Sequence, residues 1–230
     1  MYKRRRVTAV VLAGGSGSRM GIAENKVYLP LNGKPAILYA VESFDRHPYV
    51  DELVFVTRAD EQAVAEELLR TAALKKPWCI VPGGASRQAS VRNGIAEVRS
   101  RLVLVHDGAR PVVRKEQISA CVEALCHYDG AILALPVAED VYRVTKRKAP
   151  PERLKQKLYA AQTPQGFHTK TLRACHEKHQ NNPDITDDSC LLELEGYRVG
   201  IVAGDIWNRK LTTPLDVAVM EAQLSKLNDN

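Results

Sequence analysis

The sequence predicts an α/β fold in which helices cover both faces of a mainly parallel sheet. Three observations support this class. Strand-like and helix-like segments alternate through the first half of the chain. The first apolar run, residues 7–12, reads as a buried strand and ends in a glycine-rich turn. The length of 230 residues fits one α/β domain. We therefore expect a single domain over residues 1–230.

Apolar periodicity and turn residues predict the elements in order. Asp60 is placed to cap a helix, Pro82-Gly83-Gly84 ends a strand, and Thr213-Pro214 is typical of a helix start. In the first half we expect strands at 52–57, 78–81, 102–105 and 131–135, and helices at 36–44, 60–71, 86–98 and 115–128. In the last third we expect helices at 169–179, 187–195 and 214–227, and a strand at 198–202.

The segment from 136 to 162 has a different character, because it is polar and carries Pro150-Pro151 in its middle. Weak alternation predicts a protruding β-arm at about 137–161, a hairpin with limbs at 140–145 and 155–161 and the prolines near its tip. An exposed hairpin tends to pair with another chain. A second copy of this chain is the simplest partner, so the sequence predicts a homodimer.

Composition excludes several classes. Lysine plus arginine is 33 and aspartate plus glutamate is 27, a balance of +6 that suits an anionic small substrate and is modest for a nucleic-acid protein. The five cysteines form no Cys-x-x-Cys pair, which predicts reduced thiols without zinc. No apolar run approaches the ~20 residues of a membrane helix, and no signal-peptide core follows the basic start. We expect a cytoplasmic protein.

The turn after the first strand has the features of a phosphate cradle. Gly14, Gly15 and Gly17 let backbone N–H groups approach an anion, and Arg19 and Lys26 supply positive charge. The glycines alone are also typical of an ordinary tight turn.

Two known glycine loops do not fit this turn. A dinucleotide-binding turn read from Gly15 has Met20 in place of its third glycine. A P-loop needs Gly-Lys where Arg19 and Met20 stand. Nicotinamide chemistry and ordinary P-loop ATPase or kinase chemistry are therefore disfavoured.

Three later stretches place functional residue types just beyond strands. They are residues 83–90 with Arg87 and Ser90, residues 106–111 with Asp107 and Arg110, and residues 207–214 with Lys210. Each alone also has a structural explanation, as a helix cap, an Asp–Arg pair and a capped helix start. An aspartate such as Asp107 can take a ribose hydroxyl or a metal ion.

Together the four stretches predict a nucleoside triphosphate site beside a second phosphorylated reactant. Mg²⁺ would bridge the triphosphate, and no protein nucleophile is needed, because a substrate phosphate can attack the α-phosphate. No residue is assigned as a metal ligand. The serines of these motifs have no His/Asp partner at triad-like positions, which disfavours a serine hydrolase.

The motifs also occur in the order typical of a known family. They are Leu-Ala-Gly-Gly-Ser-Gly-Ser-Arg-Met with Asn25-Lys26, Gly-Gly-Ala-Ser-Arg-Gln-Ala-Ser-Val, Val-Leu-Val-His-Asp-Gly-Ala-Arg-Pro, Gln-Thr-Pro-Gln-Gly-Phe, Thr-Asp-Asp-Ser and Lys-Leu-Thr-Thr-Pro. This series resembles the 2-C-methyl-D-erythritol 4-phosphate cytidylyltransferase family, from residue 7 to about 220. The resemblance implies a Rossmann-like nucleotidyltransferase fold, a homodimer with an arm that reaches the partner's site, and Mg²⁺-dependent joining of CTP to methylerythritol phosphate with release of pyrophosphate.

The resemblance also implies roles for individual residues. Arg19 and Lys26 correspond to the pair that stabilises the transition state at the α-phosphate, and Asp107 and Ala109 correspond to the ribose contacts. Lys210 corresponds to a lysine that positions methylerythritol phosphate, and Arg110 supports the acceptor pocket. The residues implied to hold the cytosine and triphosphate are Ala13, Gly14, Gly15, Ser16, Gly17, Gly83, Arg87 and Ser90.

The arm departs from the family pattern. Glu139-Asp140 stands where the family usually has Asp-Thr, and Lys155 aligns with a family arginine. A lysine keeps the charge and loses the bidentate fork, which Arg153 nearby can supply. Asp140 and Lys155 are therefore expected to position the acceptor, and the alternative acceptor is another polyol phosphate such as D-ribitol 5-phosphate. Two other classes stay open: a nucleic-acid-binding module and an inactive nucleotide-binding regulator.

Overall fold

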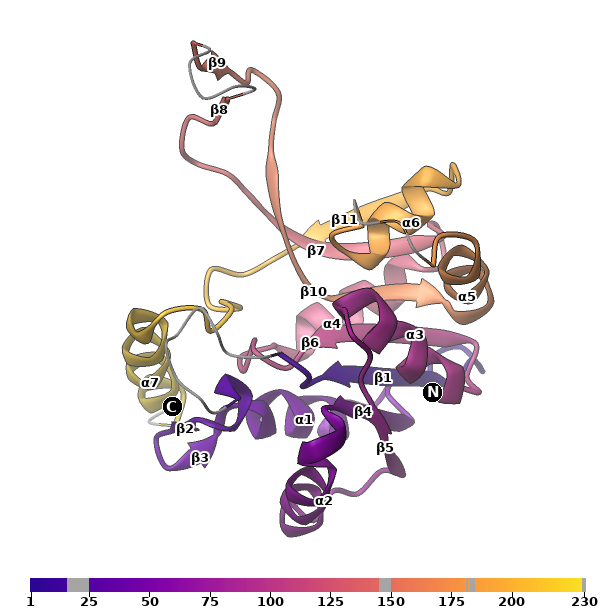
Figure 1. Ribbon diagram of the computed structural model, residues 1–230, viewed down its shortest axis with the longest axis vertical. Helices are drawn as coiled ribbons and strands as arrows, with labels where there is room; N and C mark the ends of the chain where they lie inside the picture. Colours follow the sequence, from indigo (N-terminus) through magenta and orange to yellow (C-terminus); the bar gives the residue numbers. More distant parts are fainter. Residues whose placement is uncertain (16–24, 145–149, 181, 183–184, 229–230) are drawn as a thin grey trace.

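The computed structural model describes residues 1–15, 25–144, 150–180, 182 and 185–228. Seven strands form the central sheet (Figure 1): β1 (Val7–Leu12), β4 (Glu52–Thr57), β5 (Trp78–Pro82), β6 (Leu102–Asp107), β7 (Gly130–Pro136), β10 (Tyr159–His168) and β11 (Val199–Ala203). They lie in the order β11-β7-β10-β6-β1-β4-β5. Neighbours are parallel except at β10, which is antiparallel to both β6 and β7. The predicted α/β class with a mainly parallel sheet is confirmed.

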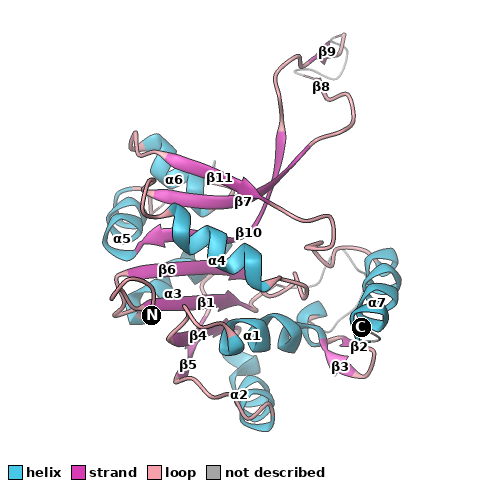
Figure 2. Cartoon of the chain, turned by 180° about the vertical axis from the view of Figure 1, so that it is seen from behind, coloured by secondary structure: helices cyan, strands magenta, loops and turns pink. Residues whose placement is uncertain are grey.

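Helices cover both faces of this sheet (Figures 1 and 2). The strand β1 shows why, because its side chains alternate between two buried apolar clusters. Val7 and Val11 pack in the cluster that includes α1, α2, α4 and α7, whereas Val10 and Leu12 pack with α3, α5 and α6. The helices are α1 (Ala36–Arg46), α2 (Gln62–Thr71), α3 (Arg87–Glu97), α4 (Lys115–Ala124), α5 (Thr169–Lys178), α6 (Asp188–Leu194) and α7 (Pro214–Asn228).

A hairpin arm projects from the sheet after β7 (Figures 1 and 2). Its short ladder pairs β8 (Tyr142–Arg143) with β9 (Glu152–Arg153), and the Val137 amide donates to the Leu158 carbonyl near its base. The first predicted limb, 140–145, contains β8, whereas β9 lies before the second predicted limb. The second limb, 155–161, overlaps the start of β10, whose first residues pair with β7 in the main sheet.

Several further element boundaries differ from the expectations, and Asp60 does not cap α2, which begins at Gln62 after Glu61. β6 continues through His106 and Asp107, because their backbones stay paired with β1. α4 ends at Ala124, since residues 125–127 bond three residues back and tighten into turns. Residues 162–168, read in the sequence as a motif, belong to β10.

Smaller elements complete the described chain. A 3₁₀ turn, η2 (Lys26–Tyr28), follows the first glycine loop, and η3 (Ala59–Glu61) precedes α2. The two-residue strands β2 (Pro30–Leu31) and β3 (Lys34–Pro35) form a hairpin. The five cysteines are free thiols. Within the described residues no helix has the length and apolarity to cross a membrane. The cytoplasmic location stays a prediction.

Candidate active site

A pocket of about 400 Å³ lies where the sequence motifs meet. It opens at the carboxyl ends of β1 and β6 and at the start of α3, the edge at which α/β sheets bind ligands. The described residues that line it are Leu12, Gly14, Gly15, Lys26, Val27, Gly84, Ala85, Ser86, Arg87, Ser90, Asp107, Ala109 and Lys210.

The first glycine loop supplies the base of the pocket. The Ala13 amide donates to the Val56 carbonyl, so the chain leaves β1 alongside β4. Asn25 then ties the far end of the loop back, because its side-chain amide donates to the Ala13 carbonyl and to Glu61. This clamp places Lys26 in the pocket with 7% of its surface exposed. A buried lysine beside a glycine loop is suited to an anionic ligand.

The second glycine turn forms the wall at the start of α3. Gly83 donates to the Thr57 carbonyl, and the Gly84 amide donates to the Ser90 hydroxyl at 3.0 Å. A side chain on Gly84 would collide with Ala89, so only glycine fits there. Ser86 caps α3 by accepting from the Ala89 amide at 3.1 Å.

The end of β6 carries the carboxylate of the site. The Asp107 amide donates to the Thr163 hydroxyl at 3.0 Å, and that hydroxyl bonds Nδ1 of His106 at 3.1 Å. His106 Nε2 in turn bonds the Arg110 carbonyl at 3.0 Å. Burial lowers the pKa of His106 to about 4, so the imidazole is neutral and Nε2–H is the donor. Thr163 on β10 thus holds the backbone of Asp107 in place.

Lys210 reaches the pocket from the loop before α7. The Leu211 amide donates to the Ala109 carbonyl at 2.7 Å, which attaches this loop to the end of β6. Asp216 secures the other side, because its carboxylate accepts from the amides and hydroxyls of Thr212 and Thr213. Lys210 therefore enters the pocket on a fixed backbone.

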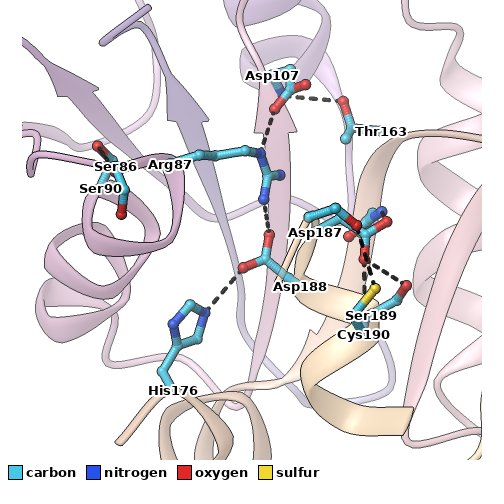
Figure 3. Close-up of polar contacts among 12 residues, drawn as sticks. Ser86, Arg87, Ser90, Asp107, Thr163, His176, Asp187, Asp188, Ser189 and Cys190 are labelled. Atoms are coloured by element: carbon cyan, nitrogen blue, oxygen red, sulfur yellow. Dashed lines mark hydrogen bonds and ion pairs between the residues drawn. The ribbon is translucent and has the colours of Figure 1, made fainter. Parts of the chain in front are cut away.

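Two cations meet the Asp107 carboxylate. Arg87 Nε is 3.1 Å from Oδ1, and Lys210 Nζ is 2.6 Å from Oδ2 (Figure 3 shows the arginine contact). Burial opposes ionisation of Asp107, but Arg87 and Lys210 outweigh it and hold its pKa well below the usual range. The carboxylate is consequently charged at neutral pH.

The arginine has a second anionic partner outside the pocket. Arg87 Nη1 is 2.7 Å from Oδ2 of Asp188, and Oδ1 of Asp188 accepts from His176 Nε2 at 3.0 Å (Figure 3). Burial acts against the charge of Arg87, yet Asp188 and Asp107 raise its pKa above the ordinary value. Asp188 is also ionised, because Arg87 and His176 lower its pKa against burial.

The structure brings together most of the residues predicted for the nucleotide, with the predicted catalytic Lys26 and with Lys210, which was predicted for the acceptor. Gly14, Gly15, Lys26, Arg87, Ser90, Asp107, Ala109 and Lys210 all line the pocket. Ala13 and Gly83 are backbone neighbours of lining residues and hold the two loops to β4. The predicted residues Ser16, Gly17 and Arg19 lie outside the described residues.

The residues predicted for the acceptor are more scattered. Arg110 points toward the start of β10, where its guanidinium donates to the carbonyls of Asn208 at 2.7 Å and Ala161 at 3.3 Å. Asp140 and Lys155 lie on the arm, which extends away from the body that holds the pocket (Figure 1). Asp140 pairs there with Arg153.

Sequence reasoning missed three residues that support the site: Thr163, His176 and Asp188. Thr163 and Asp188 stand in the Gln-Thr-Pro-Gln and Thr-Asp-Asp-Ser motifs, so the motifs marked them without assigning a contact. His176 carries no motif signal, and only the structure reveals its contact with Asp188.

A larger space, about 630 Å³, lies between the limbs of the arm. It is lined by residues 136–141 and 153–159 and lacks the glycine loops. In the smaller pocket, by contrast, backbone amides, cations and a carboxylate converge at the strand ends, and these are groups that suit a nucleotide.

The fold and the pocket define a nucleotidyltransferase of the α/β class. The pattern of the 2-C-methyl-D-erythritol 4-phosphate cytidylyltransferase family matches residues 7–226, and the chain belongs to this family. The relative of that name from Caldanaerobacter subterraneus subsp. tengcongensis is 39% identical over 228 residues, which cover 96% of this chain and 99% of the relative. The one from Alkaliphilus metalliredigens is 35% identical over 231 residues, with coverage of 97% and 95%.

Solved structures agree with this assignment. The crystal structure of 4-diphosphocytidyl-2C-methyl-D-erythritol synthase from Anaerococcus prevotii has a TM-score of 0.85 and 26% identity, and 96% of each chain is covered. The 2-C-methyl-D-erythritol 4-phosphate cytidylyltransferase from Thermus thermophilus has a TM-score of 0.76 and 26% identity, with coverage of 94% of this chain and 98% of that chain. The predicted family and Rossmann-like fold are confirmed.

Proposed function

We propose that this chain transfers the cytidylyl group of CTP to 2-C-methyl-D-erythritol 4-phosphate, giving 4-diphosphocytidyl-2-C-methyl-D-erythritol and pyrophosphate. The observation that carries the proposal is the convergence of Lys26, Arg87, Lys210 and Asp107 on one pocket at the carboxyl ends of the strands. Membership of a family with this activity supports it.

The reaction needs positioning and charge stabilisation rather than a protein nucleophile. An oxygen of the acceptor phosphate attacks the α-phosphorus of CTP and forms a new P–O bond. The bond from the α-phosphorus to the bridging oxygen breaks, and its electron pair leaves on pyrophosphate. Lys26 stabilises the charge that gathers on the α-phosphate oxygens, and we propose that Arg19 assists it.

The pocket offers the groups that a ribonucleoside triphosphate requires. The backbone of Gly14 and Gly15 and the turn at Gly84 face the ligand space. We propose that Asp107 and Ala109 contact the ribose and that Arg87 contacts the triphosphate. Gly83 and Ser90 act by shaping the turn, because Ser90 Oγ is engaged with Gly84 and with the Ser86 carbonyl.

Mg²⁺ is the proposed metal. Asp107 is the one carboxylate among the described lining residues, and the described chain holds no cluster of three histidine, cysteine or acidic residues suited to a metal. This donor set fits a Mg²⁺ ion held mainly by triphosphate oxygens and water, which is how the ion is usually bound beside nucleotides. When bound, it would neutralise phosphate charge and help pyrophosphate to leave.

The acceptor end of the site involves Lys210 and, we propose, a second copy of the chain. Asp140 and Lys155 lie on the projecting arm, and we propose that they contact the acceptor in another protomer's pocket. Tyr142, Val144 and Tyr159 leave apolar surface exposed along the arm, which favours burial against a partner. Arg110 braces the base of β10 and supports the acceptor side indirectly.

Pyrophosphate release with CTP, Mg²⁺ and each candidate acceptor tests the proposal. We expect release with methylerythritol phosphate and little with D-ribitol 5-phosphate, since the relatives named above are methylerythritol phosphate enzymes. Replacing CTP with ATP is the matched control, because a pocket for a pyrimidine excludes the larger purine. Release with ribitol phosphate alone would overturn the acceptor assignment.

A further inference from the structure

A partly buried chain of polar and charged side chains leads from the nucleotide pocket to α6 and α5. It runs from Lys210 through Asp107, Arg87 and Asp188 to His176, and consecutive partners are 2.6, 3.1, 2.7 and 3.0 Å apart. Figure 3 shows the arginine between the two carboxylates, with His176 joined to the second, Asp188. The first three residues line the pocket, whereas Asp188 and His176 do not.

Asp188 and His176 are buried at a depth that requires a reason. Asp188 is 1% exposed in the first turn of α6, and His176 is 0% exposed on α5. Burying a carboxylate is costly unless it is paired. On the side of the pocket Asp188 is paired with Arg87, and His176 is bonded to Asp188. No hydrogen bond from His176 Nδ1 to another described residue is found. The imidazole therefore contacts Asp188 through Nε2–H, which donates to the carboxylate.

The contacts leave one edge of the arginine for a ligand. Nε of Arg87 is held by Asp107 and Nη1 by Asp188. No hydrogen bond joins Nη2 to a described residue, and Arg87 lines the pocket. Two carboxylates thus fix the plane of the guanidinium, so that little side-chain freedom remains to be lost when an anion binds.

We propose that Asp188 and His176 are positioning residues for the nucleotide. Asp188 holds Arg87 so that Nη2 faces the triphosphate, and His176 fixes the orientation of the Asp188 carboxylate by donating to its other oxygen. The inference rests on the proposed function and adds two residues on α5 and α6 that touch neither substrate. Charge alone does not require them, because Asp107 already pairs with Arg87.

The first test compares His176→Leu with His176→Gln. The leucine variant removes the donor to Asp188, and the glutamine variant keeps an N–H group. Loss of one hydrogen bond to a charged group corresponds to about a ten-fold change in affinity. We expect His176→Leu to raise the KM and the calorimetric Kd for CTP by about this factor, with kcat and the acceptor KM nearly unchanged. His176→Gln should restore much of the loss.

The second test separates positioning from mere support of the fold. In an Arg87→Met background, His176→Leu should have no further effect on CTP affinity, because the residue through which it acts is gone. Asp188→Asn should reproduce the CTP defect of His176→Leu. His47→Leu is the matched control, since His47 is also buried but bonds Lys115 and Ser119 on the other face. It should lower the melting temperature and leave the CTP affinity intact.

The outcomes distinguish the inference from the proposed function. Wild-type protein that releases no pyrophosphate from CTP with methylerythritol phosphate would remove the proposed function. An active wild type whose CTP affinity is unchanged in His176→Leu and Asp188→Asn would remove the inference alone. Equal losses of CTP affinity in His176→Leu with and without Arg87 would also overturn it.

Discussion

Lys26 is buried because its neighbour Asn25 ties the chain to the end of β1 and to Glu61. A lysine rarely lies at this depth without a functional or pairing reason. Its place among the lining residues of the pocket fits the role of stabilising the charge on the α-phosphate. Lys26 was predicted from its spacing after the glycine loop. The contacts of Asn25 with Ala13 and Glu61 explain how that spacing brings Lys26 into the pocket.

Lys26→Ala should therefore act mainly on turnover. Removing one group that stabilises transition-state charge costs about 10²-fold in kcat. We expect a loss of this size with a small change in the KM for CTP, measured by pyrophosphate release. Lys75→Ala, at an exposed lysine far along the chain, is the control and should behave as wild type. Unchanged turnover in Lys26→Ala would remove this residue from the chemistry.

His106 makes stability depend on pH in the mildly acidic range. Burial lowers its pKa from 6.5 to about 4, so the unfolded chain takes up a proton that the folded chain refuses. The contribution of His106 to the free energy of unfolding is complete above the pKa of the unfolded chain. It is lost as the pH falls toward the pKa of the folded chain. Stability should fall by up to about 1.4 kcal/mol per pH unit in this window.

Urea unfolding at about pH 7 and about pH 5 measures this loss. A His106→Gln variant should show a smaller difference between the two pH values, even though it is less stable overall. His47 has a similarly lowered pKa, so it will account for part of what remains. A loss of the same size in His106→Gln and wild type would exclude His106 as a source.

At the scale of elements, α3 packs very closely on the sheet. Gly94 allows this approach, because a Cβ there would lie 2.7 Å from side-chain carbons of both Val10 and Val56. Close packing holds the start of α3, with Ser86 and Arg87, at the pocket. Glycine is therefore required inside a helix, where it is ordinarily unfavourable.

Gly94→Ala should destabilise the protein, contrary to the usual effect of alanine in a helix. Intrinsic propensity would favour alanine by about 1 kcal/mol, but overpacking costs about 1–3 kcal/mol. Urea denaturation should show a lower midpoint. Ala96→Gly on the exposed face of the same helix should lose only the propensity difference. A more stable Gly94→Ala would contradict the packing argument.

The sequence predicted the apolar strands and amphipathic helices well, because their patterns are local. It missed most of β10, whose buried residues include Gln162, Thr163 and Gln165. These polar side chains lie inside because Gln162 bonds Asp205, Thr163 bonds Asp107 and Gln165 bonds Asp187. Partners so distant along the chain leave no periodicity to recognise. For the same reason the contacts of Asp188 with Arg87 and of His176 with Asp188 could not be predicted from the sequence.

At the scale of the whole molecule, the arm holds Asp140 and Lys155, two residues proposed for the acceptor, away from the pocket. Lys26 lies in the body, whereas Lys155 lies on the arm. If sites are shared between protomers, as we propose, two defective chains can repair each other. A dimer of one Lys26→Ala chain and one Lys155→Ala chain contains one pocket with both lysines intact.

Mixing these two variants tests the dimer and the arm together. After subunit exchange at equal amounts, half of the dimers are mixed, and each has one intact site of two. Activity at an acceptor concentration well below KM should rise to about a quarter of the wild-type value. Sedimentation should give the mass of a dimer. Activity equal to the average of the separate variants would refute a shared site.

The position of β10 also decides the order in which the protein can fold. It occupies the middle of the sheet between β6 and β7, although it is made after both. A chain emerging from the ribosome can pair β1, β4, β5 and β6 early, but β6 keeps an open edge until residue 168 is available. Pulse-labelled hydrogen exchange during refolding should therefore show amides of β1 and β4 protected before those shared by β6 and β10.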